Sequence, residues 1–106
     1  MRLRDYQEHS KRTLNKDLKE KEQLANMIIG IMGESGEVAD IIKKSLYQGH
    51  ELDRENIAEE IGDIMFYIVN LCNVLDLDLE TLIANNYYKL LERYPNGFEV
   101  SRSVNR

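Results

Sequence analysis

Residues 60–75, which read EIGDIMFYIVNLCNVL, are the stretch most informative about the fold. Placed on a helix, they carry apolar side chains over most of the circumference, and they show no alternation of period two. A helix that is apolar over most of its surface is buried on more than one side. The sequence therefore predicts a central helix that starts after Asp53, its N-cap, and runs to about Leu75.

On both sides of this stretch, glycine and proline separate further segments with the three-and-four spacing of helices. Upstream, helices are predicted from Leu3 to Asn15 and from Glu20 to Leu46, the second ending before Gln48-Gly49. Downstream, a helix is predicted between Asp78 and Pro95, followed by a polar tail from about residue 99. We therefore expect an all-α protein, a four-helix bundle whose single domain spans residues 1–106.

Composition and charge argue against several classes of protein. A net charge of −5 disfavours a partner that is a nucleic acid polymer, because such binders carry basic patches. The apolar run 64–75 is shorter than the roughly 20 residues of a membrane span, and residues 1–18 do not resemble a signal peptide. The single cysteine, Cys72, cannot form an internal disulfide. We expect a cytoplasmic protein with no membrane partner, which self-associates to cover its apolar central helix.

Two pairs of acidic residues repeat one spacing on consecutive predicted helices. Glu34 and Glu37 are three residues apart, as are Glu60 and Asp63. Residues with this spacing lie about 60° apart around a helix, so each pair can direct its oxygens to one point. Four carboxylates in one place repel each other unless a cation neutralises them, and oxygen ligands suit Mg²⁺ or Mn²⁺. The alternative is a solvated acidic border, which many amphipathic helices have.

Glycines and cationic residues add to this pattern. Four glycines inside the predicted helices each cost about 1 kcal/mol relative to alanine, and they leave room either for close helix packing or for metal and phosphate. They are Gly30, Gly33, Gly36 and Gly62. On the last predicted helix, Asn86, Lys89 and Arg93 recur at three and four residues, and such donors suit phosphate oxygens. A solvated helix face is the alternative for these three.

The combination resembles the MazG-like all-alpha nucleoside triphosphate pyrophosphohydrolase superfamily. Its signature is Glu-x-x-Glu followed by Glu-x-x-Asp on a later helix, and the likeness extends through residues 33–44, 59–67, 86–90 and 93–98. These segments look like the short phage and bacterial branch. The resemblance implies Mg²⁺-dependent hydrolysis of a nucleoside or deoxynucleoside triphosphate to the monophosphate and pyrophosphate. It also implies a homodimer or homotetramer.

The resemblance assigns roles to individual residues. Glu34, Glu37, Glu60 and Asp63 would be metal ligands and catalytic residues, with Glu34 or Glu37 orienting the attacking water. The candidates for contact with the nucleotide are Lys44, Tyr67, Asn86, Lys89 and Arg93. The chain has no tryptophan, which larger relatives use around the base, so the base preference is left open. The alternative function is a non-catalytic helical module that senses nucleotides or binds another protein.

Overall fold

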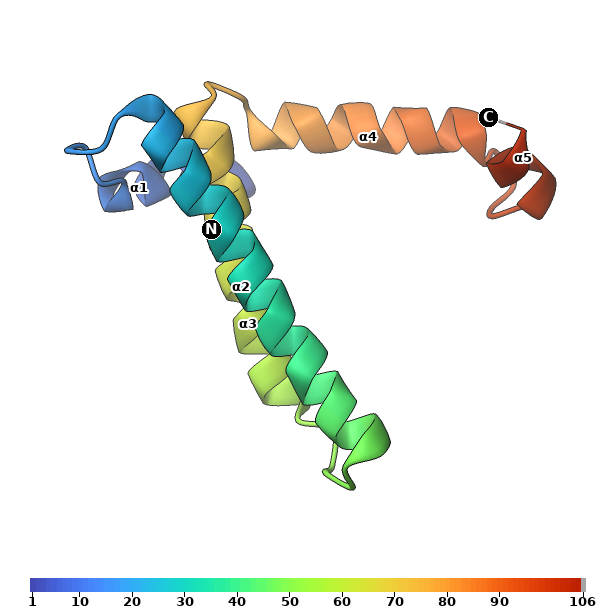
Figure 1. The fold of residues 1–106 in the computed structure, drawn as a ribbon. Helices are drawn as coiled ribbons and strands as arrows, with labels where there is room; N and C mark the ends of the chain where they lie inside the picture. The colour runs from blue at the N-terminus through green and yellow to red at the C-terminus, as the bar shows by residue number, and fades with distance from the viewer. Residues whose placement is uncertain (106) are drawn as a thin grey trace.

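The structure, a computed structural model, describes residues 1–105 as five α-helices and one short 3-10 helix (Figure 1). In chain order these are α1 (Leu3–Ser10), η1 (Lys11–Thr13), α2 (Glu20–Tyr47), α3 (Arg54–Val74), α4 (Leu79–Arg93) and α5 (Val100–Val104). Since these residues form no β-strand, the predicted all-α class is confirmed. Arg106, the end of the predicted polar tail, lies outside the described residues.

The described residues contain no candidate for a membrane-spanning helix. Within residues 1–105, every helix is too short or too polar to cross a bilayer.

Local signals set the ends of the three longest helices. The carboxylates of Asp53 and Asp78 accept hydrogen bonds from the backbone N–H groups of Asn56 (3.1 Å) and Thr81 (3.2 Å), which caps α3 and α4. After α2, Gly49 adopts a φ of +74° and turns the chain. The predicted bounds of α2, α3 and α4 are confirmed to within about two residues, which is the usual uncertainty of helix ends.

The first helix is shorter than the predicted Leu3–Asn15. It ends at Ser10, whose hydroxyl donates to the Tyr6 carbonyl (2.8 Å), while the Thr13 hydroxyl donates to the Ser10 carbonyl (2.6 Å). Side-chain bonds of this kind compete with the regular helical ladder, and the chain tightens into η1 before it becomes extended at Leu14. The helix α5, in the segment predicted as a polar tail, was also not foreseen.

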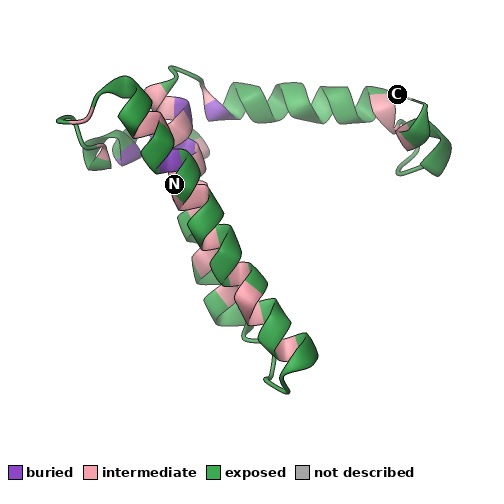
Figure 2. Ribbon diagram, viewed as in Figure 1, coloured by how far each residue is buried: buried purple, intermediate pink, exposed green. Residues whose placement is uncertain are grey.

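The hydrophobic core lies where α1, α3 and the start of α4 meet. The helices α2 and α3 form an antiparallel hairpin, and α1 packs against the end of α3 that is far from the hairpin turn (Figure 1). Buried residues gather at this end (Figure 2). They include Val69, Cys72 and Leu79, against which Leu3, Tyr6, Met65 and Ile68 pack. Because α3 contacts both α1 and α2, it is the central helix that its apolar circumference predicted.

The helix α4 extends away from the hairpin instead of packing along it (Figure 1). Its first residue, Leu79, is 2 % exposed, whereas all residues from 80 to 92 are exposed. Within one chain, therefore, residues 1–105 do not close a four-helix bundle. Large apolar side chains remain exposed on α4 (Leu82, Ile83, Tyr87, Leu90, Leu91) and on α2 (Ile28, Ile29, Met32, Leu46).

Candidate functional site

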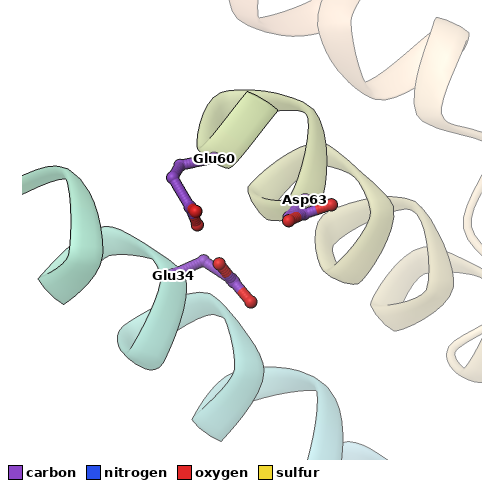
Figure 3. A group of neighbouring side chains, drawn as sticks. All are labelled: Glu34, Glu60 and Asp63. Carbon is purple, nitrogen blue, oxygen red and sulfur yellow. The ribbon is translucent and has the colours of Figure 1, made fainter. Parts of the chain in front are cut away.

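Three acidic side chains converge between α2 and α3. Glu34 on α2 and Glu60 and Asp63 on α3 each offer a carboxylate oxygen, and these oxygens all lie within 4.8 Å of one another (Figure 3). Glu34 and Glu60 are half-buried, while Asp63 is exposed. The two helices thus bring together residues that are 26 to 29 positions apart in the sequence, at the middle of the hairpin.

A contact between Gly30 and Tyr67 sets the register of the hairpin. A Cβ atom at Gly30 would overlap the ring of Tyr67, so the ring can lie against α2 only because glycine stands there. Glu34 is four residues after Gly30, and Asp63 is four residues before Tyr67. Since the helices are antiparallel, both acids lie one turn from the contact in the same direction. The contact therefore brings Glu34 to the level of Asp63.

Glu60 has the most perturbed environment of the three. Its Oε2 atom is buried and has no hydrogen-bond partner among residues 1–105. The pKa of Glu60 is raised from 4.5 to about 7, first because its carboxyl group shares a hydrogen bond with Glu34, then because of burial and the negative charges of Glu34, Asp63 and Glu37. Carboxylates this close do not all ionise unless a proton or another cation lies between them.

The cluster fits a hard divalent cation. All its donors are carboxylate oxygens, which Mg²⁺ and Mn²⁺ prefer. Oxygens that bind an octahedral Mg²⁺ at 2.0–2.1 Å lie about 3 to 4 Å apart, slightly closer than the 4.8 Å limit of this cluster. A cation would also satisfy the unpartnered Oε2 of Glu60. Glu34, Glu60 and Asp63 therefore need only small side-chain adjustments to act as ligands.

The fourth predicted carboxylate, Glu37, stands beside the cluster. Glu37 is exposed on α2 and its oxygens are not among the mutually close ones, although its charge contributes to the raised pKa of Glu60.

Lys44, a predicted nucleotide contact, pairs with Asp40 at 2.9 Å, and the hydrogen bond to Asp40 is the main reason why the pKa of Lys44 is raised. Asp40 is not among the predicted site residues, although its four-residue spacing from Lys44 is the signal for such a pair.

The predicted phosphate ligands on α4 do not meet the carboxylates of the same chain. Asn86 is exposed on the extended helix, and Lys89 and Arg93 line a cavity near its far end. Arg102 of α5 joins that lining, which also includes Glu92, Glu99, Ser101 and Asn105. The predicted site residues do not include Arg102, because its segment is predicted only as a polar tail.

Comparisons with known proteins show the family to which the chain belongs. The sequence model of the MazG nucleotide pyrophosphohydrolase domain matches residues 22–98, a segment that contains the acidic cluster and α4. The chain is also 34% identical over 89 residues to the Gene 37 protein of Mycobacterium phage L5, which covers 80% of this chain and 78% of that protein. No solved structure matches the chain. The family match and the identity to the phage protein together show that this chain belongs to the MazG nucleotide pyrophosphohydrolase domain family.

Proposed function

We propose that the chain is an Mg²⁺-dependent enzyme that hydrolyses a nucleoside or deoxynucleoside triphosphate to the monophosphate and pyrophosphate. The observation that carries the proposal is the cluster of Glu34, Glu60 and Asp63, with its buried and unpartnered Glu60 oxygen. Mn²⁺ is the alternative cation, because it prefers the same oxygen ligands. Membership of the family supports a nucleotide as the substrate.

The cluster would hold the cation against the phosphates. Mg²⁺ bound there would neutralise charge on the triphosphate and lower the pKa of a bound water molecule. Water would then cleave the phosphoanhydride bond between the α- and β-phosphates. Glu34, Glu60 and Asp63 would be the ligands, since their oxygens converge.

Glu37 is the residue that we assign to the water. It is one turn from Glu34 on α2 and is exposed, so its carboxylate is free to accept a proton from a water molecule at the edge of the cluster. Its charge is close enough to raise the pKa of Glu60. We therefore assign the water to Glu37 and keep Glu34 as a metal ligand.

We propose that a second copy of the chain completes the site. Along α4, Asn86 and Arg93 lie within about 40° of Leu79 around the helix axis, and Lys89 within about 80°, on the same side as the exposed Leu82 and Leu90. If these apolar residues pack against another chain, the three donors face that chain too. The α4 helix of one subunit would then bring its donors to the carboxylates of the other, in a homodimer or a dimer of such dimers.

Cys72 supports a reducing location. The thiol is buried and free, and burial together with the charge of Asp78 raises its pKa. A protein that depends on no disulfide suits the cytoplasm, where we propose that it acts on free nucleotides and not on nucleic acid polymers.

The activity is tested by measuring pyrophosphate release from a panel of nucleoside and deoxynucleoside triphosphates, including modified bases. We expect turnover of at least one with Mg²⁺. Glu60→Gln should lower the rate more than about 100-fold, because loss of even an outer partner of a metal ligand costs 10- to 100-fold. The matched control is Glu59→Gln, which changes an exposed neighbour outside the cluster and should keep full activity.

Failure of this test has a defined meaning. If the protein hydrolyses none of the triphosphates with Mg²⁺ or Mn²⁺, the proposed activity is wrong. Stabilisation by a triphosphate without turnover would instead identify a nucleotide-sensing module.

Subunit mixing tests the shared site. Glu60→Gln and Arg93→Ala chains should each be nearly inactive, and a mixed dimer would hold one site with both an intact cluster and an intact α4. We expect activity to return when the two variants are unfolded together and refolded. If the mixture stays inactive although mass measurement shows mixed dimers, α4 does not serve the site of its partner.

A further inference from the structure

Gln7 of α1 holds the junction between α3 and α4. Its side chain is 8 % exposed, and its Nε2 donates to the Leu77 carbonyl (2.8 Å) and to Oδ1 of Asn73 (3.1 Å). Its Oε1 accepts from the backbone N–H of Leu79 (3.0 Å), the first residue of α4. In addition, Nδ2 of Asn73 donates to the backbone carbonyl of Gln7 (3.1 Å). Every hydrogen-bonding group of the Gln7 amide therefore takes part.

An amide suits this position because it donates two hydrogen bonds and accepts a third. Leu77 offers an acceptor and Leu79 a donor, so the side chain between them has to donate on one side and accept on the other. A glutamate of the same shape would set a carboxylate against the Leu77 carbonyl and the Asn73 Oδ1 atom. The bond to Leu79 also satisfies one of the four N–H groups that have no partner within their own helix at the start of α4.

Arg4, one turn earlier on α1, extends the same connection. Its guanidinium pairs with Asp78 (3.3 Å) and Glu80 (2.8 Å). All three side chains are partly exposed, so these pairs contribute less than the buried bonds of Gln7. Through Gln7 and Arg4, α1 contacts four consecutive residues, from Leu77 to Glu80, where the chain leaves α3 and enters α4.

The direction of α4 within the chain depends on this junction, because residues 80–92 are all exposed and only the root of the helix is buried. At 1.5 Å per residue the 15 residues of α4 span about 22 Å, so a rotation of about 10° at the root moves the far end by about 4 Å. A small change at Gln7 is thereby magnified at Lys89 and Arg93.

We propose that Gln7 is a positioning residue, which fixes the direction of α4 and so places Asn86, Lys89 and Arg93 for the triphosphate. This role rests on the proposed function for its consequence in catalysis, but not for its structural part. The residue lies outside the matched family segment 22–98, in a helix that the match does not include.

The structural part is tested by distance measurement between spin labels at Tyr47→Cys and Glu92→Cys, two exposed positions on α2 and α4. Cys72 is buried and should stay unlabelled, and an excess of unlabelled chain removes distances between subunits. Gln7→Glu should shift or broaden the distance distribution by about 4 Å or more, the displacement expected from a rotation of about 10°. The matched control Glu8→Gln, an exposed neighbour, should leave the distribution unchanged.

The catalytic part is read from the separate kinetic constants. Gln7→Glu should raise KM for the triphosphate about fivefold or more with kcat within about twofold, because it loosens binding groups and leaves the carboxylates in place. Mg²⁺ affinity should not change. An unaltered distance distribution overturns the proposal, and so does a parallel fall in kcat and Mg²⁺ affinity, which would indicate general loss of structure.

Two further results are decisive. If Gln7→Glu does not fold, Gln7→Ala is measured instead, because it removes the three side-chain bonds without adding a charge, and an unchanged distance distribution in that variant overturns the proposal. A shifted distribution in a protein that hydrolyses no triphosphate would support the positioning of α4 and refute the proposed function.

Discussion

Acidification from about pH 8 to about pH 6 should weaken Mg²⁺ binding roughly tenfold, since the cation and a proton compete for Glu60. The pKa of this group is raised from 4.5 to about 7, chiefly through its contact with Glu34. The perturbation therefore falls within a pH range in which ordinary carboxyl groups do not titrate.

The magnitude follows from the fraction of Glu60 that is ionised. With a pKa of about 7, roughly nine-tenths of the groups carry a proton at pH 6 and roughly one-tenth at pH 8, so the metal-free site that is ready to bind differs about tenfold. A carboxyl group with the ordinary pKa of 4.5 would be ionised at both values and would change the affinity by only a few per cent. The two cases are easily distinguished.

The stability of the metal-free protein should also depend on pH, and the raised pKa of Glu60 gives the direction of the change. A carboxyl group whose pKa is raised on folding stabilises the folded state fully below pH 4.5, and this contribution is lost as the pH rises through about 7. Metal-free wild-type protein should thus lose Tm relative to Glu60→Gln between pH 5 and pH 8. Mg²⁺ should restore more Tm to the wild type at pH 8 than at pH 6.

Isothermal titration calorimetry with Mg²⁺ at the two pH values is the assay, with Glu59→Gln as the matched control. The wild type and the control should both show the tenfold change, whereas Glu60→Gln should bind weakly at either pH. A change in wild-type affinity of less than about twofold would refute the reasoning, because Glu60 would then titrate as an ordinary carboxyl group.

Three further tests, two of them with a control substitution, concern the hairpin, a turn and the core. Gly30→Ala should lower both Tm and Mg²⁺ affinity, and it should cost about 1–3 kcal/mol in unfolding free energy, because the new Cβ overlaps the Tyr67 ring. Gly33→Ala should lower neither Tm nor Mg²⁺ affinity, because a Cβ there meets nothing within 4 Å among the described residues. Asp76 has a φ of +55°, so Asp76→Val should cost about 1–2 kcal/mol in a denaturant titration, while Asp76→Gly should cost nothing. Val69→Ala should cost about 2 kcal/mol by the same measurement, because Val69 is fully buried in the core; an unchanged midpoint would contradict that placement.

The helices were predictable from sequence where a residue acts on its own neighbours. Asp53 and Asp78 cap helices through bonds to residues three positions on, and Gly49 turns the chain by its own φ angle. The early end of α1 was missed, because Ser10 and Thr13 are compatible with a helix until their hydroxyl groups bond to the backbone. The direction of α4 was not predictable, since it depends on Gln7, whose partners are 66 to 72 residues away.

The candidate site divides in the same way. Helical spacing was enough to place Glu60 and Asp63 on one side of α3, and Glu34 converges with them. Spacing alone did not show that Glu37 would stand aside, because that depends on the register of two helices. Gly30 and Tyr67 determine the register, and the importance of a missing side chain becomes visible only when the opposing ring is known.

The contact of Gly30 with Tyr67 fixes how α2 and α3 align, so the turn at Gly49 does not have to hold the two helices in register. About 17 residues, or roughly 26 Å of helix, separate Gly30 from the last residue of α2. A tag or fluorophore inserted beside Gly49 would extend the loop without sliding one helix past the other. The turn is therefore the natural attachment point for anyone who wishes to label or immobilise this protein with its acidic cluster intact.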